Sequence, residues 1–292
     1  MIIVPEDWEP LAGAEGAATV GVWRARVGGE RWIVKRLARP AEEGDRRSFR
    51  WWRRELEFAR SDLAGRLAGL RAPRYRVEED DAGATLWSAE ISSRPVPDKI
   101  AAHALGRLTT TRIEDPGWFP VGRLRDRVGL AAAAGGVELL DPDHGDRDAL
   151  TLARRVWDRR AAVLDRLDSL PQVLCHGDAL PRNLLRHDGS TVTAIDWDQL
   201  GYGPIGADLA SFGLWAGSPA ESLLPAFTAG AGSVHRHAVV DGLACTTSLI
   251  GVTRAIRAAG VEQADGAGPV GPYRARLDRS VWSMIRTLAV VP

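Results

Sequence analysis

Residues 175–183 read Cys-His-Gly-Asp-Ala-Leu-Pro-Arg-Asn, and residues 194–198 read Ala-Ile-Asp-Trp-Asp. Together they form the pattern His-x-Asp-x-x-x-x-Asn, from His176 to Asn183, followed thirteen residues later by Asp196. An apolar run, residues 191–195, leads into this aspartate and is typical of a short buried strand. The pattern therefore predicts that two carboxylates and one amide meet beside the end of a strand.

These three side chains have the chemistry that phosphoryl transfer requires. A carboxylate such as Asp178 accepts the proton of an acceptor hydroxyl, and an amide oxygen with a second carboxylate holds magnesium on the phosphates. The alternative is a plain turn in which Asn183 serves as a cap. Asn183 is the only asparagine in the chain, and its place at the one position that calls for a neutral oxygen ligand favours the phosphoryl-transfer interpretation.

The motif resembles that of the aminoglycoside phosphotransferase and choline kinase group within the protein-kinase-like superfamily. The resemblance implies that Asp178 is the catalytic base, that Asn183 and Asp196 bind Mg²⁺, and that His176 is a scaffold residue of the catalytic loop. It also implies ATP as the phosphate donor, with GTP as an alternative, and a small-molecule hydroxyl as the acceptor.

Neighbouring residues agree with the small-molecule branch of that superfamily. Gly177 stands where protein kinases carry arginine, and Trp197 and Asp198 replace the Phe and Gly of their D-F-G motif. Only eight residues separate Asp198 from the Ala-Asp-Leu at 207–209, which resembles the structural aspartate of the family. Such a short interval leaves little room for a peptide-docking segment and disfavours a protein kinase.

The N-terminal part of the chain resembles the nucleotide-binding strands of the same family. Residues 18–27 and 31–37 predict a β-hairpin, whose second strand would direct Lys35 toward nucleotide phosphates, beneath a glycine-rich cover containing Gly13 and Gly16. The alternative for this lysine is a solubilising residue on an edge strand. The chain has two lysines against 36 arginines, so a lysine retained here favours a role that a guanidinium cannot fill.

Helical spacing of apolar residues predicts a helix over residues 47–67. The resemblance implies that this helix supplies a carboxylate to Lys35, and Glu55 is preferred over Glu57. Two further strands are expected at 75–77 and 85–91.

The predicted fold class is α+β and bilobal, with the protein-kinase-like arrangement. A small lobe of antiparallel sheet and one helix spans residues 1–91, a Pro- and Ser-rich hinge spans 92–98, and a larger, mainly helical lobe spans 99–292. At the hinge, Glu90, Ile91 and Ser92 are expected to contact the nucleotide. In the larger lobe we expect helices at 100–109 and 150–170, a loop at 131–148, strands at 172–175, 184–186 and 191–195, and three or four helices from residue 207 onward.

Composition excludes several other functions. Lys and Arg number 38 and Asp and Glu also 38, so no basic excess indicates binding to nucleic acid or to an anionic membrane. The N-terminus lacks the pattern of a signal peptide, which favours a cytoplasmic protein. The apolar segment 238–252 is expected to be a core helix, and Cys175 and Cys245 to be buried thiols.

The acceptor and the quaternary structure stay open at this level. From residue 199 onward, six acidic residues face seven arginines, which argues against a polycationic aminoglycoside and leaves a neutral natural product or sugar at least as favoured. The acidic segment 141–148 is expected to be a solvated loop, with substrate contact as the alternative. A non-catalytic nucleotide-binding relative would be expected to have lost a catalytic group, whereas all are present. The oligomeric state is not predicted.

Overall fold

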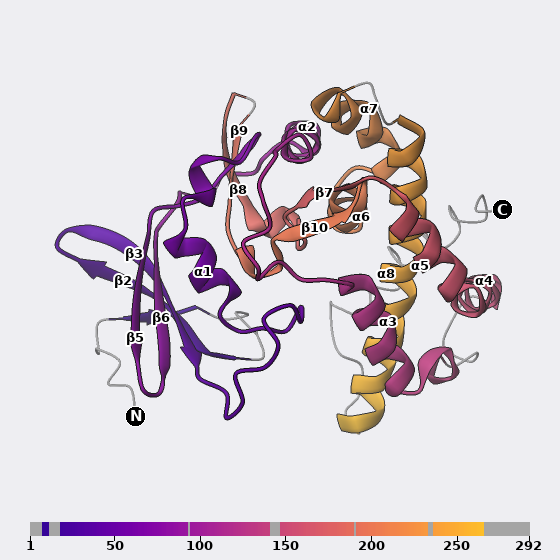
Figure 1. Ribbon diagram of the computed structural model, residues 1–292, viewed down its shortest axis with the longest axis horizontal. Helices are drawn as coiled ribbons and strands as arrows, with labels where there is room; N and C mark the ends of the chain where they lie inside the picture. The colour runs from indigo at the N-terminus through magenta and orange to yellow at the C-terminus, as the bar shows by residue number, and fades with distance from the viewer. Residues whose placement is uncertain are drawn as a thin grey trace.

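The computed structural model describes residues 8–11, 18–92, 94–140, 147–189, 191–232 and 236–265. Figure 1 shows a twisted sheet with one helix, α1, on one side of the molecule and a group of helices on the other, with short strands between them. The α+β class and the bilobal arrangement expected from the sequence are confirmed.

The smaller lobe is built on a five-stranded sheet in the order β1-β2-β3-β6-β5, in which every neighbouring pair is antiparallel. Its strands are β1 Glu9–Pro10, β2 Thr19–Val27, β3 Glu30–Ala38, β5 Tyr75–Asp80 and β6 Gly83–Ala89. The predicted hairpin is present, and Gly28 and Gly29 form its turn with φ of 59° and 81°. Such positive φ angles favour glycine because it has no Cβ.

The helix predicted over residues 47–67 is much shorter than expected. Helix α1 spans Arg54–Arg60 and is followed by a 3₁₀ turn, η1 Leu63–Gly65. The buried guanidinium of Arg54 donates hydrogen bonds to the carbonyls of Arg46, Ser48 and Phe49 at 2.6–3.3 Å. Because these carbonyls turn toward one side chain, the preceding segment folds as turns and cannot continue the helix.

Helices dominate the larger lobe. They are α2 Asp98–Leu108, α3 Arg123–Ala133, α4 Arg147–Asp158, α5 Arg160–Ser169, α6 Ala207–Gly213, α7 Ala220–Ala231 and α8 Arg236–Asp265, with a 3₁₀ turn, η2 Gly136–Leu139. The helix predicted at 150–170 is divided at Arg159, the N-cap of α5. The prediction of a loop over 131–148 is wrong in part, since this range contains the end of α3 and all of η2. Val128 of α3 and Val137 of η2 are buried in the same apolar cluster.

Two small sheets lie between the sheet lobe and the helices. β7 Gln172–Cys175 pairs with β10 Gly201–Pro204, and a second sheet has the order β4-β9-β8, with β4 Leu70–Arg71, β8 Leu184–Asp188 and β9 Thr191–Ala194. β4 and β10 were not anticipated, because each is too short to show a sequence pattern. β4 belongs to the N-terminal segment, yet it pairs in parallel with β9. The main-chain pairing therefore ties the two parts of the chain together.

Helix α8 serves as a core helix. By length and composition alone, its segment Arg236–Arg257 is apolar enough to cross a membrane, with a mean hydropathy of 1.3. However, 67% of its most apolar stretch is buried inside the protein, as expected of a core helix. It packs against α3, α5 and α6. Cys175 and Cys245 are both buried free thiols, as expected.

The acidic segment 141–148 is only partly covered by the structure. Asp141, Asp143, His144 and Asp146 lie outside the described residues, as do residues 266–292. Among the described residues, no group of three or more His, Cys, Asp or Glu side chains could hold a metal ion.

Two glycines set the packing of α2 against α7. A Cβ on Gly106 would collide with the carbonyl oxygen of Phe227, and a Cβ on Gly230 would collide with that of His103. The backbones of the two helices therefore approach each other directly, and α2, which follows the predicted hinge, is held firmly in the larger lobe.

Replacing Gly106 by alanine should destabilise the protein by about 1–3 kcal/mol, because the new methyl group forces the helix backbones apart. The free energy of unfolding in urea measures this effect. Gly129→Ala is the matched control: it lies in α3 with nothing within 4 Å of its Cβ position, and should stabilise the protein by about 0.5–1 kcal/mol through helix propensity. Equal unfolding free energies for Gly106→Ala and the unaltered protein would contradict the close approach.

Candidate active site

A buried aspartate fixes the backbone of residues 176–180, the loop between β7 and η4 that carries Asp178 and is called the motif loop below. Asp208, 2% exposed at the start of α6, accepts hydrogen bonds from the backbone N–H of His176 at 2.7 Å and from that of Gly177 at 2.9 Å. Both carboxylate oxygens are thereby used. The loop that carries Asp178 is held by charge-assisted bonds, which are stronger than bonds between neutral groups.

His176 connects this loop to the end of β9. Its Nδ1 accepts the backbone N–H of Asp178 at 3.3 Å. The other nitrogen, Nε2, lies 3.0 Å from the carbonyl oxygen of Ile195 and so carries the proton that it donates. His176 is completely buried, and its contacts are those of the scaffold residue that the sequence predicted.

Gly177 cannot be replaced without displacing the loop. Its φ is +84°, and an added Cβ would overlap Nη1 of Arg123 and the carbonyl oxygen of Gln199. The guanidinium of Arg123 occupies that position and donates to the Gln199 carbonyl at 2.9 Å. This close contact explains why glycine precedes Asp178.

Asn183 positions the carboxylate of Asp178. Its Nδ2 donates to the backbone oxygen of Asp178 at 2.9 Å and to Oδ2 of the same residue at 3.1 Å. Asn183 is 3% exposed, in the 3₁₀ turn η4 Pro181–Asn183. Because the amide nitrogen is used on Asp178, the amide oxygen is left as a neutral ligand. The second oxygen of Asp178, Oδ1, forms no hydrogen bond within the described ranges.

Asp196 adopts an unusual backbone conformation at the end of β9. Its φ of 65° and ψ of 61° are left-handed, and no other non-glycine residue in the described part of the chain has a positive φ. Such strain persists only where the surroundings impose it. The next residue, Trp197, begins the 3₁₀ turn η5 Trp197–Gln199 and is completely buried.

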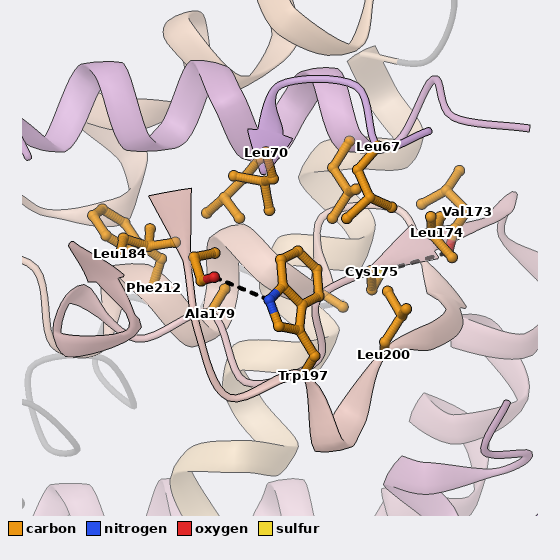
Figure 2. Close-up of a cluster of buried hydrophobic side chains, with 14 of the residues drawn as sticks. Leu67, Leu70, Val173, Leu174, Cys175, Ala179, Leu184, Trp197, Leu200 and Phe212 are labelled. Atoms are coloured by element: carbon orange, nitrogen blue, oxygen red, sulfur yellow. Dashed lines mark hydrogen bonds between the residues drawn. The ribbon is translucent and has the colours of Figure 1, made fainter. Parts of the chain in front are cut away.

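Trp197 is the anchor that imposes this conformation. Figure 2 shows its ring at the centre of a cluster that includes Leu70, Ala179 and Leu184, with its Nε1 directed at a backbone oxygen. That bond is to Ala194 at 3.0 Å, and the ring stacks on Phe58 of α1 at 4.7 Å. Burial of this indole therefore turns the Asp196 carboxylate away from the core.

Lys35 joins the two lobes at this carboxylate. Its Nζ donates to Oε2 of Glu55 at 2.8 Å and to Oδ1 of Asp196 at 3.2 Å. Glu57 instead lies beside Arg53 and Arg60, so the structure settles the choice between the two glutamates in favour of Glu55.

The electrostatics of this trio follow from its geometry. Burial alone would lower the pKa of Lys35, but the carboxylates of Glu55 and Asp196 raise it above its ordinary value. Burial likewise opposes ionisation of Asp196, yet the adjacent Lys35 ammonium holds its pKa below the usual range. Lys35 and Asp196 are therefore charged at neutral pH.

Asp198 is a further carboxylate in the site. Burial and the charge of Asp196 raise its pKa to about 7, and Gln199 Nε2 donates to its Oδ2 at 3.2 Å. Its backbone oxygen accepts a bond from Arg54 at 3.0 Å. Asp198 had no predicted chemical role, although its place two residues after Asp196 is a signal that a second acidic group lies nearby.

The residues expected around the nucleotide base lie at the end of β6. Glu90 donates its N–H to the Arg31 carbonyl at 3.0 Å, and its carboxylate accepts a bond from Arg24 Nε at 2.7 Å. Ile91 and Ser92 follow in an irregular segment. Gly13 and Gly16 lie outside the described residues. Nucleotide contact by these five residues stays a prediction.

A family model described as the phosphotransferase enzyme family matches residues 7–242. The chain belongs to this family. It is therefore a kinase, a phosphotransferase with an alcohol group as acceptor, and the recognition of the family from the motif at 176–198 is confirmed. A comparison with curated proteins finds no match.

Comparison with solved structures shows that this chain has the protein-kinase-like fold expected from its sequence. A choline/ethanolamine kinase family protein from Mesorhizobium loti is 18% identical, with a TM-score of 0.61 over 98% of this chain and 88% of that chain. The phosphotransferase APH(2″)-IIIa, in complex with GDP and kanamycin, is 15% identical, with a TM-score of 0.62 over 99% and 95% of the two chains. The amicoumacin kinase hAmiN, in complex with AMP-PNP, Ca²⁺ and Ami, is 15% identical, with a TM-score of 0.59 over 98% of this chain and 90% of that chain.

Proposed function

We propose that this phosphotransferase transfers the γ-phosphoryl group of ATP or GTP to a hydroxyl of a small molecule, with Asp178 as the base. The observation that carries the proposal is the convergence of Lys35, Asp178, Asn183 and Asp196. These residues come from β3, the motif loop, η4 and the end of β9, and hydrogen bonds link them in two pairs, Lys35 with Asp196 and Asn183 with Asp178. A non-catalytic relative has no need of all four.

Asp178 has the geometry of a general base. One carboxylate oxygen, Oδ2, is oriented by Asn183, and Oδ1 is left to accept the proton of the acceptor hydroxyl. As that proton moves to Asp178, the hydroxyl oxygen forms a bond to the γ-phosphorus and the bond to the nucleoside diphosphate breaks.

The donor set of Asn183 and Asp196 fits a magnesium ion. One neutral amide oxygen and one ionised carboxylate are hard oxygen ligands of the kind that Mg²⁺ prefers, and Asp198 lies two residues further along the same turn. When bound, Mg²⁺ would neutralise charge on the nucleotide phosphates. Lys35, held by Glu55, would contribute a second positive charge to the same phosphates.

The structural neighbours support a nucleotide and a small-molecule acceptor. One of them was solved in complex with GDP and kanamycin, and another in complex with AMP-PNP, Ca²⁺ and Ami. Because one complex contains a guanine and the other an adenine nucleotide, both ATP and GTP are retained as donors. We propose the same lobe division as the sequence suggested, with the nucleotide between residues 1–91 and 99–292.

A protein kinase is disfavoured by the segment between Asp198 and α6. Residues 201–204 of this interval form β10, which pairs with β7, and Asp208 directly after it holds the motif loop. The residues of this interval are therefore part of β10 and of the turns beside it, and they leave no separate segment that could dock a peptide.

Asp178→Asn should lower kcat by about 10² to 10⁴-fold, because an amide cannot accept the proton. The activity is measured on an acceptor identified by mass-shift screening of sugars, amino alcohols, macrolides and aminoglycosides. Nucleotide affinity should stay near that of the unaltered protein. Asp188→Asn, an exposed aspartate on β8 paired only with Arg71, is the control and should leave kcat unchanged. Full activity of Asp178→Asn would refute the assignment.

Nucleotide should raise the melting temperature much more with Mg²⁺ than with a chelator, because bound ligand adds RT ln(1 + [L]/Kd) to stability. The extra increment should vanish in Asp196→Ala, which removes the carboxylate ligand. The measurement is a thermal melt with ATP and, separately, GTP. Equal shifts in the presence and absence of Mg²⁺ would argue against the proposed metal site.

Lys35→Arg should lower kcat/KM by at least about tenfold, equivalent to roughly 1.4 kcal/mol of transition-state stabilisation. The guanidinium is wider and planar, so it cannot lie between Glu55 and Asp196 at the distances that the ammonium adopts. Lys99 is exposed on α2, and the control variant Lys99→Arg should leave kcat/KM unchanged. If both variants behave alike, the phosphate site does not include Lys35.

A further inference from the structure

Three arginines gather beside the catalytic loop, on two helices that pack together. α3 carries Arg123 and Arg127, one helical turn apart, and α8 carries Arg254. α3 and α8 are in contact and lie side by side in Figure 1. We refer to Arg123, Arg127 and Arg254 as the arginine cluster. None of its members was a predicted site residue.

The cluster begins next to the proposed base. Arg123 fills the space above Gly177, the residue before Asp178, and donates to the Gln199 carbonyl. Arg127, one turn further along α3, is within electrostatic range of Asp178, Asp198 and the other two arginines. The positive charge therefore lies on the side of Asp178 that α3 and α8 form.

Arg127 is the member of the cluster whose guanidinium has no hydrogen-bond acceptor among the described residues. It is half-buried. Burial first, and then repulsion from Arg123 and Arg254, lowers its pKa to about 10 against the attraction of Asp178 and Asp198, so it is charged at neutral pH. Within the described part of the chain it forms no hydrogen bond or ion pair, and a partly desolvated guanidinium without acceptors is costly.

Arg54 shows how this protein treats an arginine that serves structure alone. Its buried guanidinium donates to five backbone carbonyls, those of Arg46, Ser48, Phe49, Trp118 and Asp198. Arg127 has no such set. A bound anion would supply the acceptors that Arg127 lacks among the described residues.

The two nearby carboxylates do not serve as its partners. Asp178 is held by Asn183 and Asp198 by Gln199. Among the described carboxylates, none lies within ion-pair distance of Arg123 or Arg127. Arg254 lies over the ring of Trp215, 5.3 Å from its centroid.

We propose that the acceptor carries an anionic group, a carboxylate or a phosphate, which Arg127 binds together with Arg254 while the acceptor hydroxyl lies at Asp178. The planar fork of a guanidinium matches both anions in a bidentate manner. The same charges repel the ammonium groups of aminoglycosides and choline. This inference rests on the proposed function and defines its substrate class as hydroxy acids and sugar phosphates.

The test compares related sugars and sugar acids that carry different charges. The probes are gluconate, glucose and glucosamine as one set, and ribose 5-phosphate with ribose as another, each with ATP and Mg²⁺. Phosphorylated product is detected by mass shift, and binding by the change in melting temperature. We expect the anionic member of at least one set to exceed its neutral counterpart by about tenfold or more in kcat/KM or in affinity. The gluconate and ribose 5-phosphate sets distinguish carboxylate from phosphate.

Variants on one helix identify the residue responsible. Arg127→Gln should abolish the advantage of the anionic probe, and Arg127→Lys should retain part of it. Arg125→Gln is the matched control, because Arg125 is an exposed arginine of α3 paired with Asp165 and Asp168, and it should keep the advantage. Melting curves in ATP and Mg²⁺ verify that each variant folds and binds nucleotide.

Two results would overturn the inference while leaving the proposed function intact. One is magnesium-dependent nucleotide binding with neither turnover nor stabilisation by any anionic probe beyond its neutral counterpart. The other is an Arg127→Gln variant that loses nucleotide affinity and keeps its acceptor preference, which would assign Arg127 to the donor phosphates. If the unaltered protein does not bind nucleotide at all, the proposed function itself is refuted.

Discussion

The ammonium of Lys35 is the interaction on which the site depends, because it contacts one carboxylate from each lobe. Glu55 lies on α1 beside the sheet, and Asp196 follows β9 in the other part of the chain. Two like charges this close would repel each other, and a single cation between them converts that repulsion into a link. The contacts of Lys35 with Glu55 and Asp196 therefore also place the sheet and α1 relative to the motif loop.

The link is useful only because the backbone beneath it is rigid. Trp197 is buried next to the strained Asp196. Asp208 accepts hydrogen bonds from two backbone N–H groups of the motif loop. Arg54 collects carbonyls from both lobes, including that of Asp198. Each of these groups uses a buried polar or aromatic contact to fix a backbone position, so the side chains that face the substrate are preorganised rather than assembled on binding.

The charged groups of the site fall into two regions. Around Lys35, carboxylates and one lysine form a compact group. Along α3, Arg123 and Arg127 have no described carboxylate within ion-pair distance, so positive charge is in local excess there. Since the net charge of the whole chain is zero, this local excess is a property of the packing of two helices and is invisible in composition. The solved structures that share this fold are only 13–19% identical to this chain, so the shared fold does not determine the charge of its acceptor side.

The sequence by itself determined the fold class, the hairpin with Lys35 and the roles expected of Asp178, Asn183 and Asp196, because local spacing and rare residue types carry that information. It favoured Glu55 as the partner of Lys35 without settling the choice. Tertiary structure alone decided the rest. The helix expected at 47–67 is shortened because Arg54 draws the preceding carbonyls to its guanidinium, and β4 is defined only by its pairing with β9. The convergence of Arg123 and Arg127 with Arg254, more than 120 residues away along the chain, depends on the packing of α3 against α8. Contacts between distant segments leave no periodic trace in a sequence, and the packing of α3 against α8 is such a contact.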